Sequence, residues 1–252
     1  MEWVKEFYHK QYEWMSMDDD EAIKYQEGSI RKMEGLSEKP VHNILELGGG
    51  KGHFAVAAAE RGYKVTVIEL VEEAARYIRQ LAAERNVQDH LRIINGDFYT
   101  LELEEEFDAV CYWDGFGIGT DRDQERLLTR IENWLKQDGT AFIEVYTPWY
   151  WAKVAGKELN ISESVTRRYD FNAEQCRMLD TWRDKMDSAG QVTQSLRCYS
   201  PADLRLLLRD RNLYLVHCEP GGEMDYDNWE FHEQVSLNTA MTFLAKFKKS
   251  RL

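Results

Sequence analysis

Residues 41–52 read VHNILELGGGKG, and this stretch decides the fold of the 252-residue chain. Ile44, Leu45 and Leu47 form a short apolar run that ends at three consecutive glycines, and residues 53–61 have the alanine-rich composition of a helix. The pattern predicts a buried strand, a tight turn and the start of a helix. Glycine can adopt positive φ and lets a ligand approach the backbone, while a helix N-terminus offers unpaired N–H groups. We therefore expect a nucleotide-like ligand at this turn.

The spacing of the glycines separates two kinds of nucleotide site. Dinucleotide-binding folds carry G-x-G-x-x-G after their first strand, whereas here the glycines fall at positions 48, 50 and 52 and position 53 is histidine. The stretch from Glu46 to Gly52 resembles the first motif of class I S-adenosylmethionine (SAM)-dependent methyltransferases, an acidic residue followed by G-x-G-x-G. That resemblance implies SAM as cofactor, with Glu46, Gly48 and Gly50 at its amino-acid end. A glycine-rich hairpin without a ligand is the structural alternative.

Composition and charge limit the functions open to the chain. With 43% hydrophobic residues the chain is globular. It has no uncharged apolar run of about 18 residues and no signal-peptide pattern, so we expect a cytoplasmic protein without a membrane segment. The formal net charge of −13 repels phosphate backbones, which argues against a nucleic-acid partner. The four cysteines lack metal-site spacing and are expected to be reduced thiols, with no metal bound.

Acidic residues follow the second and third predicted strands. Residues 63–70 read YKVTVIEL and predict a strand that ends at Glu69 and Leu70, where ligands of open α/β sheets bind. Glu69 is placed to accept hydrogen bonds from two ribose hydroxyls. The third strand, residues 91–94, leads to Asp97 and Phe98, which resemble the superfamily's adenine site. A surface glutamate and a simple Gly-Asp turn are the structural alternatives.

A fourth strand, residues 107–113, is followed by a loop that contains Trp113, Asp114 and Phe116. A helix over 121–136 and a fifth strand over 140–146 continue a strict alternation of strand and helix, which predicts a doubly wound parallel sheet. In the superfamily that the chain resembles, this loop lies between cofactor and substrate. The resemblance thus implies that Trp113 and Asp114 contact the cofactor and that Phe116 contacts the substrate.

Aromatic residues mark the two flanks of this core. Residues 3–34 predict two helices, and the resemblance implies that such helices cover the cofactor, with Tyr8 and Tyr12 as candidates to touch it. The fifth strand ends in YTPWYW, residues 146–151, where Trp149 and Tyr150 are candidate walls of a substrate pocket. Packing into the core is the equal alternative for this run.

The remaining chain breaks the alternation. Partial alternation over 163–171, 175–184 and 191–199 predicts a three-stranded antiparallel insertion that acts as a substrate lid. Ser200 and Pro201 begin a helix, and strands are expected at 213–218 and 239–247, the last antiparallel by resemblance. The predicted whole is one Rossmann-like domain with a seven-stranded sheet, divided into a helical cover (1–40), a SAM-binding core (41–151), the insertion (152–199) and the end of the sheet (200–252).

The resemblance implies a SAM-dependent methyltransferase that transfers a methyl group by in-line displacement to a small-molecule N- or O-nucleophile. Asp114 is the expected base or orienting group; Tyr146 and His217 are weaker candidates, and His53 is expected on the cofactor side or in a structural role. The acidic charge favours a small neutral or cationic acceptor, and the protein is expected to be a monomer or homodimer. A SAM-binding regulator without catalysis and an NAD(P)-dependent oxidoreductase are the alternatives.

Overall fold

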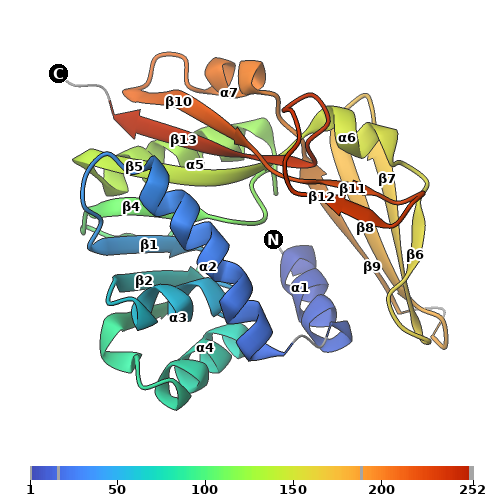
Figure 1. Cartoon of the computed structure of the whole chain (residues 1–252), viewed down its shortest axis with the longest axis horizontal. Helices are drawn as coiled ribbons and strands as arrows, with labels where there is room; N and C mark the ends of the chain where they lie inside the picture. The colour runs from blue at the N-terminus through green and yellow to red at the C-terminus, as the bar shows by residue number, and fades with distance from the viewer. Residues whose placement is uncertain (1, 16–17, 188–189, 250–252) are drawn as a thin grey trace.

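The computed structural model describes residues 2–15, 18–187 and 190–249, and its largest element is a seven-stranded sheet (Figure 1). The strand order is β10-β13-β5-β4-β1-β2-β3. β13 pairs antiparallel with both β5 and β10, whereas β1 pairs parallel with β2 and β4. This confirms the predicted Rossmann-like sheet with its last strand antiparallel. The strands are β1 (Asn43–Leu47), β2 (Lys64–Glu69), β3 (Leu91–Asn95), β4 (Phe107–Tyr112), β5 (Leu135–Tyr146), β10 (Leu213–Pro220) and β13 (Thr242–Lys249).

Helices cover both faces of this sheet because its central strands are apolar on both sides. One core cluster contains Ile30 of α2, Val56 of α3 and Ile78 of α4; the other contains Leu127 of α5 and Leu204 of α7. A short 3₁₀ turn, η1 (Gln88–His90), precedes β3. The helices are α2 (Asp19–Leu36), α3 (His53–Glu60), α4 (Glu72–Glu84), α5 (Asp121–Trp134) and α7 (Pro201–Leu207).

The strand order reverses at β1, which lies between β2 and β4. In open α/β sheets a ligand binds outside the carboxyl ends of the strands at such a switch point. Residues 48–52 follow β1 at this place, so the sequence stretch with the three glycines lies where a ligand is expected.

A second, antiparallel sheet lies beside the main one and has the order β6-β7-β8-β9 (Figure 1). The predicted insertion is confirmed, but the prediction of three strands was one strand short. The extra strand, β6 (Glu158–Asn160), has only three residues, too few to show alternation in the sequence. The others are β7 (Val165–Asn172), β8 (Arg177–Asp184) and β9 (Gln191–Arg197). Residues 188 and 189, between β8 and β9, lie outside the described residues.

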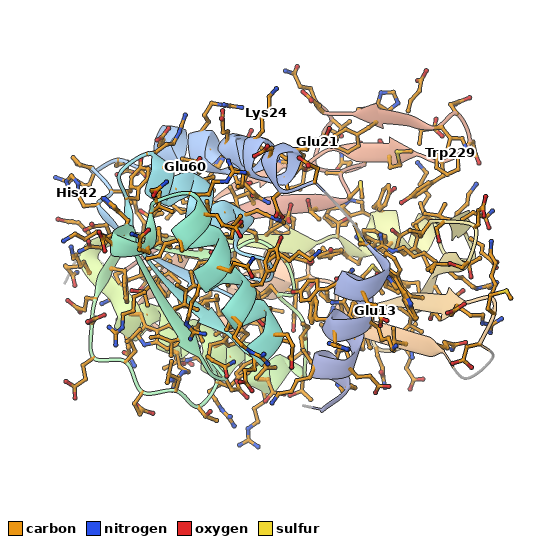
Figure 2. All side chains as sticks on the ribbon, turned by 90° about the horizontal axis from the view of Figure 1, so that it is seen from below. Glu13, Glu21, Lys24, His42, Glu60 and Trp229 are labelled. Carbon is orange, nitrogen blue, oxygen red and sulfur yellow. The ribbon has the colours of Figure 1, made fainter. Side chains whose placement is uncertain are left out.

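Helix α1 (Glu2–Trp14) lies between the helices of the main sheet and the second sheet (Figures 1 and 2). Its Phe7 packs with Val165, Trp182 and Val192 of the second sheet in one buried cluster. The helix therefore joins the two sheets across the carboxyl edge of the main sheet.

Two further elements follow the fifth and tenth strands. The aromatic run after β5 forms a short helix, α6 (Pro148–Lys153), with Pro148 in its first turn. The segment 221–233, between β10 and β13, contains a small hairpin of β11 (Glu223–Asp225) and β12 (Glu230–His232). Trp229 at its turn is 66% exposed and points outward in Figure 2. Among the helices that the structure describes, each is too short or too polar to cross a membrane.

Candidate functional site

A cavity of about 240 Å³ lies at the switch point of the main sheet, between the carboxyl ends of its strands and α1. All ten residues that the sequence assigned to the cofactor line it: Tyr12, Glu46, Gly48, Gly50, Glu69, Leu70, Asp97, Phe98, Trp113 and Asp114. The rest of the lining is Val4, Tyr8, Gln11, Gln26, Gly49, His53, Phe54, Val71, Tyr99, Tyr112 and Ile118.

The glycine turn needs glycine for geometric reasons. Gly50 has φ of 56°, and a Cβ built there would lie 3.1 Å from the Tyr12 hydroxyl. Gly52 has φ of 80°, and its Cβ would lie 2.8 Å from two side-chain carbons of Ile78. A side chain at either position would fill space at the turn or strain the backbone. The turn thus keeps its main chain at the cavity wall.

Glu69 connects the turn after β1 with the turn after β2. Its Oε2 accepts the N–H of Gly50 at 2.8 Å, and its Oε1 accepts the N–H of Val71 at 2.7 Å. The residue is 4% exposed, and burial raises the pKa of its carboxyl group. The two hydrogen bonds lower the pKa, but burial has the larger effect. Each carboxylate oxygen has a second lone pair, so Glu69 can still accept two hydroxyl groups from a ligand.

Three buried polar atoms of the cavity lining have no hydrogen-bond partner in the structure: Glu46 Oε2, Gln26 Oε1 and Trp113 Nε1. Glu46 is 3% exposed, and burial together with the nearby charge of Glu69 raises the pKa of its carboxyl group well above the ordinary value. Buried polar groups are almost always paired in native proteins. The two oxygens can accept hydrogen bonds from a polar ligand in this cavity, and the Trp113 N–H can donate one to it.

The far wall of the cavity carries Asp97 and an aromatic group. Asp97 Oδ1 accepts the N–H of Tyr99 at 2.8 Å, which orients the carboxylate at the end of β3. The Phe98 ring lies 4.8 Å from the ring of Tyr99 and 5.5 Å from that of Tyr112, measured between centroids. An acceptor beside an apolar wall suits a purine base.

Asp114 lies in the loop after β4 and is hydrogen-bonded to the end of β5. The Tyr146 hydroxyl donates to Asp114 Oδ1 at 2.9 Å, although Tyr146 itself does not line the cavity. The Asp114 side chain is exposed, and it faces the cavity. The surrounding protein atoms nevertheless remove most of the water around its carboxyl group, and this desolvation raises its pKa. Burial and the Asp114 charge also raise the pKa of Tyr146, which keeps its proton and remains a donor.

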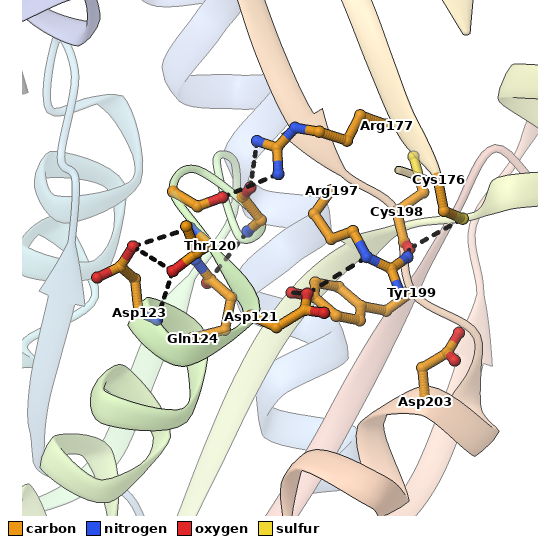
Figure 3. Close-up of polar contacts among 12 residues, drawn as sticks. Thr120, Asp121, Asp123, Gln124, Cys176, Arg177, Arg197, Cys198, Tyr199 and Asp203 are labelled. Atoms are coloured by element: carbon orange, nitrogen blue, oxygen red, sulfur yellow. Dashed lines mark hydrogen bonds and ion pairs between the residues drawn. The ribbon is translucent and has the colours of Figure 1, made fainter. Parts of the chain in front are cut away.

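The loop that carries Asp114 is held by the second sheet, as Figure 3 shows. The Arg177 guanidinium donates to the carbonyl oxygens of Gly119 at 2.8 Å and Gly117 at 3.2 Å. The Arg197 backbone N–H donates to the Gly117 carbonyl at 3.0 Å, and the Arg197 side chain lies 3.3 Å from Asp121. The insertion thus determines the position of the Asp114 loop.

The three residues predicted to contact substrate lie outside the cavity lining. Phe116 is fully buried and packs against Tyr112 and Tyr199. Tyr150 is 1% exposed and donates to the Met224 carbonyl at 2.9 Å, while Trp149 is half-buried in the same cluster. The aromatic run therefore packs into the core beneath the second sheet. Contact of these residues with a substrate stays a prediction.

The histidine candidates separate clearly. His53 lines the cavity, and its Nε2 lies 2.8 Å from Asp19 Oδ1 of α2, on the side of the glycine turn. His217 is exposed on β10, where it pairs with Glu219, and it lies outside the cavity lining.

Sequence reasoning missed Gln26, Gln194 and Glu144. Gln26 reaches the cavity from α2, Gln194 donates to the Tyr8 hydroxyl at 2.9 Å from β9, and Glu144 of β5 accepts from Thr242 at 3.0 Å. No spacing marks them, because each is brought to the cavity region by packing between elements distant in sequence.

The sheet order, with the cavity at its switch point, gives the chain the fold of class I SAM-dependent methyltransferases. Residues 44–139 match a family described as a methyltransferase domain. The CcbJ methyltransferase from Streptomyces caelestis has a similar structure, with a TM-score of 0.71, 16% identity and 94% of each chain covered. The glycopeptide N-methyltransferase MtfA, crystallised with SAM, gives a TM-score of 0.60 at 16% identity over 89% of this chain and 87% of its own.

A curated relative matches part of the chain. A protein arginine N-methyltransferase, PRMT10 of Oryza sativa subsp. japonica, is 25% identical over 100 residues, which are 39% of this chain and 26% of the relative. The match thus spans about a quarter of the relative's length. At these identities the solved structures bear on the fold, and the acceptor must be argued from the site.

Proposed function

We propose that this protein is a SAM-dependent methyltransferase that methylates a nitrogen or oxygen nucleophile of a small molecule. The observation that carries the proposal is the set of unpaired buried atoms Glu46 Oε2, Gln26 Oε1 and Trp113 Nε1 around one cavity at the switch point. Of the five buried side-chain atoms without a partner among the described residues, these three gather at one cavity, which favours a polar ligand there.

The donors and acceptors present fit SAM. Glu46 would receive the ammonium group of the methionine part, beside the main chain of Gly48 and Gly50. Glu69 would hold the ribose hydroxyls, because its two oxygens already stand at the ends of β1 and β2. Asp97 would accept from the adenine amino group. Bound SAM supplies an electrophilic methyl group on a sulfonium whose leaving group is a neutral thioether.

The protein's part in the transfer is to orient the acceptor and exclude water. Placement of two reactants in line provides most of the acceleration in such displacements. Asp114, fixed by the Tyr146 hydroxyl, is the proposed residue that orients the nucleophile or takes its proton. Tyr8 and Tyr12 of α1 close the cavity on the side away from the sheet.

The alternatives make different demands on the same cavity. A regulator that only binds SAM has no use for the Asp114–Tyr146 pair at the cavity, and this pair favours catalysis. An NAD(P)-dependent oxidoreductase would need a dinucleotide turn that residues 48–53 lack. A monomer or homodimer in the cytoplasm remains the expected state; the four cysteines are unpaired thiols in the structure, in keeping with a reducing compartment.

Thermal unfolding with cofactors tests the proposal. SAM or S-adenosylhomocysteine at 100 times its Kd should stabilise the protein by about 2.7 kcal/mol, and NAD at the same concentration should leave the Tm unchanged. A screen with methyl-labelled SAM over small amines, phenols and carboxylates then identifies the acceptor. Equal shifts with NAD, or no shift with SAM, would remove the cofactor from the proposal; cofactor binding without any methylated product would favour the regulator.

A further inference from the structure

The cavity that holds the proposed cofactor has an unusual balance of charge. Four carboxylate residues line it, Glu46, Glu69, Asp97 and Asp114, and none of the described lining residues is lysine or arginine. The one basic lining residue, His53, is already paired with Asp19 at 2.8 Å. An anionic acceptor would therefore meet repulsion and no countercharge in this cavity.

Three of these carboxylates are each proposed to bind one group of the cofactor, whereas Asp114, which also lines the cavity, is proposed to act on the acceptor. Glu46, Glu69 and Asp97 lie at the ends of β1, β2 and β3, along the length of a bound nucleoside. Asp114 lies beyond the end of β4, on the side of the second sheet. The charge of Asp114 is thus left for the acceptor.

Aromatic residues surround this fourth carboxylate. Trp113, Tyr8 and Tyr12 line the cavity beside it, and the rings of Tyr8 and Tyr12 are 6.0 Å apart. A Cβ built at Gly115 would lie 3.3 Å from the Tyr8 hydroxyl, so α1 closely approaches the Asp114 loop. A carboxylate among aromatic rings is the environment in which proteins bind ammonium groups.

The cation that faces Asp114 from the second sheet is already neutralised. Arg167 of β7 makes a bidentate pair with Asp180 of β8, at 2.9 and 2.7 Å. Its guanidinium also lies 4.7 Å from the ring centroids of both Tyr169 and Trp182, which fixes it in place. Arg167 therefore lowers the pKa of Asp114 somewhat but is not available to pair with a ligand.

The other elements around Asp114 add neutral tyrosines and one buried carboxyl group with a lysine near it. Tyr8 and Tyr12 of α1 and Tyr112 of β4 are neutral, because burial raises the pKa of each. Glu144 of β5, with Lys32 of α2 as its nearby cation, has a pKa of about 7 because of burial and the charge of Asp114. Among the residues that the structure describes, none of the cations near Asp114 lines the cavity, so Asp114 is the charged group that an acceptor beside it would meet.

We propose that the methyl acceptor is an amine that arrives protonated, and that Asp114 binds its ammonium group and takes its proton. This inference rests on the proposed function and specifies its substrate class. One N–H proton of the ammonium moves to the Asp114 carboxylate, which leaves a lone pair on nitrogen. That lone pair forms the N–C bond as the methyl–sulfur bond breaks, and the electron pair of the broken bond stays on sulfur. The positive charge passes from sulfur to the methylated nitrogen, and the proton on Asp114 later leaves to solvent.

Binding to the S-adenosylhomocysteine complex tests the inference without turnover. The probes are benzylamine and 2-phenylethylamine, each compared by calorimetry with the alcohol of the same shape at pH 7.5. We expect both amines to bind at least about tenfold more tightly than their alcohols, the value of one charge-assisted hydrogen bond. Asp114→Asn should abolish this preference when both proteins are saturated with S-adenosylhomocysteine. Asp138→Asn, at an exposed position, should keep the preference.

The outcomes separate this inference from the proposed function. If S-adenosylhomocysteine does not bind the wild-type protein, the cofactor assignment itself fails. If it binds but amines and alcohols bind equally, or neither amine binds, or Asp114→Asn retains the preference, the cofactor assignment survives and the amine inference is overturned. An O-methylated product from the labelled screen with no N-methylated one would overturn it as well.

Discussion

Replacement of Glu46 by glutamine should change stability and cofactor affinity in opposite directions. The Glu46 side chain is 3% exposed with Oε2 unpaired, and burial and Glu69 raise the pKa of its carboxyl group. A carboxyl group whose pKa is higher in the folded state costs stability as pH rises from its unfolded pKa to its folded pKa. Across that window the free energy of unfolding of the wild-type protein should fall by about 1.4 kcal/mol for each pH unit on account of this group.

Glu46→Gln cannot ionise, so this part of the pH dependence should disappear. At pH 7 the variant without ligand should then be more stable than the wild type, and each kcal/mol gained should raise the Tm by about 2–4 °C for a chain of this size. The same change removes the charged partner of the cofactor's ammonium group. A lost hydrogen bond to a charged group is worth about 1.5–3 kcal/mol, which corresponds to a Kd for SAM about 10–150 times weaker.

Urea unfolding at pH 4 to 8 and calorimetry with SAM measure the two effects. Glu60→Gln is the matched control, because Glu60 is exposed on α3 and lies outside the cavity lining. It should change the free energy of unfolding by less than about 0.5 kcal/mol and should leave SAM binding unaltered. The reasoning is refuted if Glu46→Gln retains the wild-type slope of stability with pH, or if it binds SAM as tightly as the wild type.

Three further predictions test the neighbouring groups. Gly117 has φ of 112°, and a Cβ there would lie 2.2 Å from a backbone carbonyl oxygen of β9; Gly117→Ala should destabilise the protein by about 1–3 kcal/mol and lower kcat more than SAM affinity. Gly28→Ala, in open space on α2, should instead stabilise it by about 0.5–1 kcal/mol, and similar effects of the two changes would contradict the loop contact. Glu69→Gln should weaken SAM at least about tenfold, and unchanged affinity would mean that the ribose is held elsewhere. Burial raises the pKa of Asp114, so as pH is lowered kcat/KM should begin to fall at a pH above about 4, the ordinary pKa of a carboxyl group. Asp114→Asn should remove this acid-side fall; if the fall persists, it belongs to another group.

The parallel sheet could be predicted because its signals are local. Each central strand is a short apolar run. An acidic residue lies at or near the carboxyl end of each of the first three, namely Glu46, Glu69 and Asp97. The carboxyl ends of parallel strands share one edge of the sheet, so residues dozens of positions apart in sequence could be expected to meet there. The ten residues assigned to the cofactor all line one cavity for this reason.

The acceptor side could not be predicted in the same way. Phe116, Trp149 and Tyr150 are aromatic and follow strand ends, but hydrophobic packing takes them into the core, and sequence alone does not distinguish a buried ring from a ring that lines a pocket. The short strand Glu158–Asn160 gave no periodic signal, and its pairing depends on its neighbour β7.

By itself, then, the sequence determined the fold class and the cofactor edge, because strand periodicity, glycine spacing and strand-end acids are properties of neighbouring residues. Only the tertiary structure decided the charge and shape beside Asp114. The Arg177 contacts to its loop, the Arg167–Asp180 pair and the position of Glu144 all join segments far apart in the chain. Electrostatic interactions depend on distance and burial in space, and neither can be obtained from spacing along the chain.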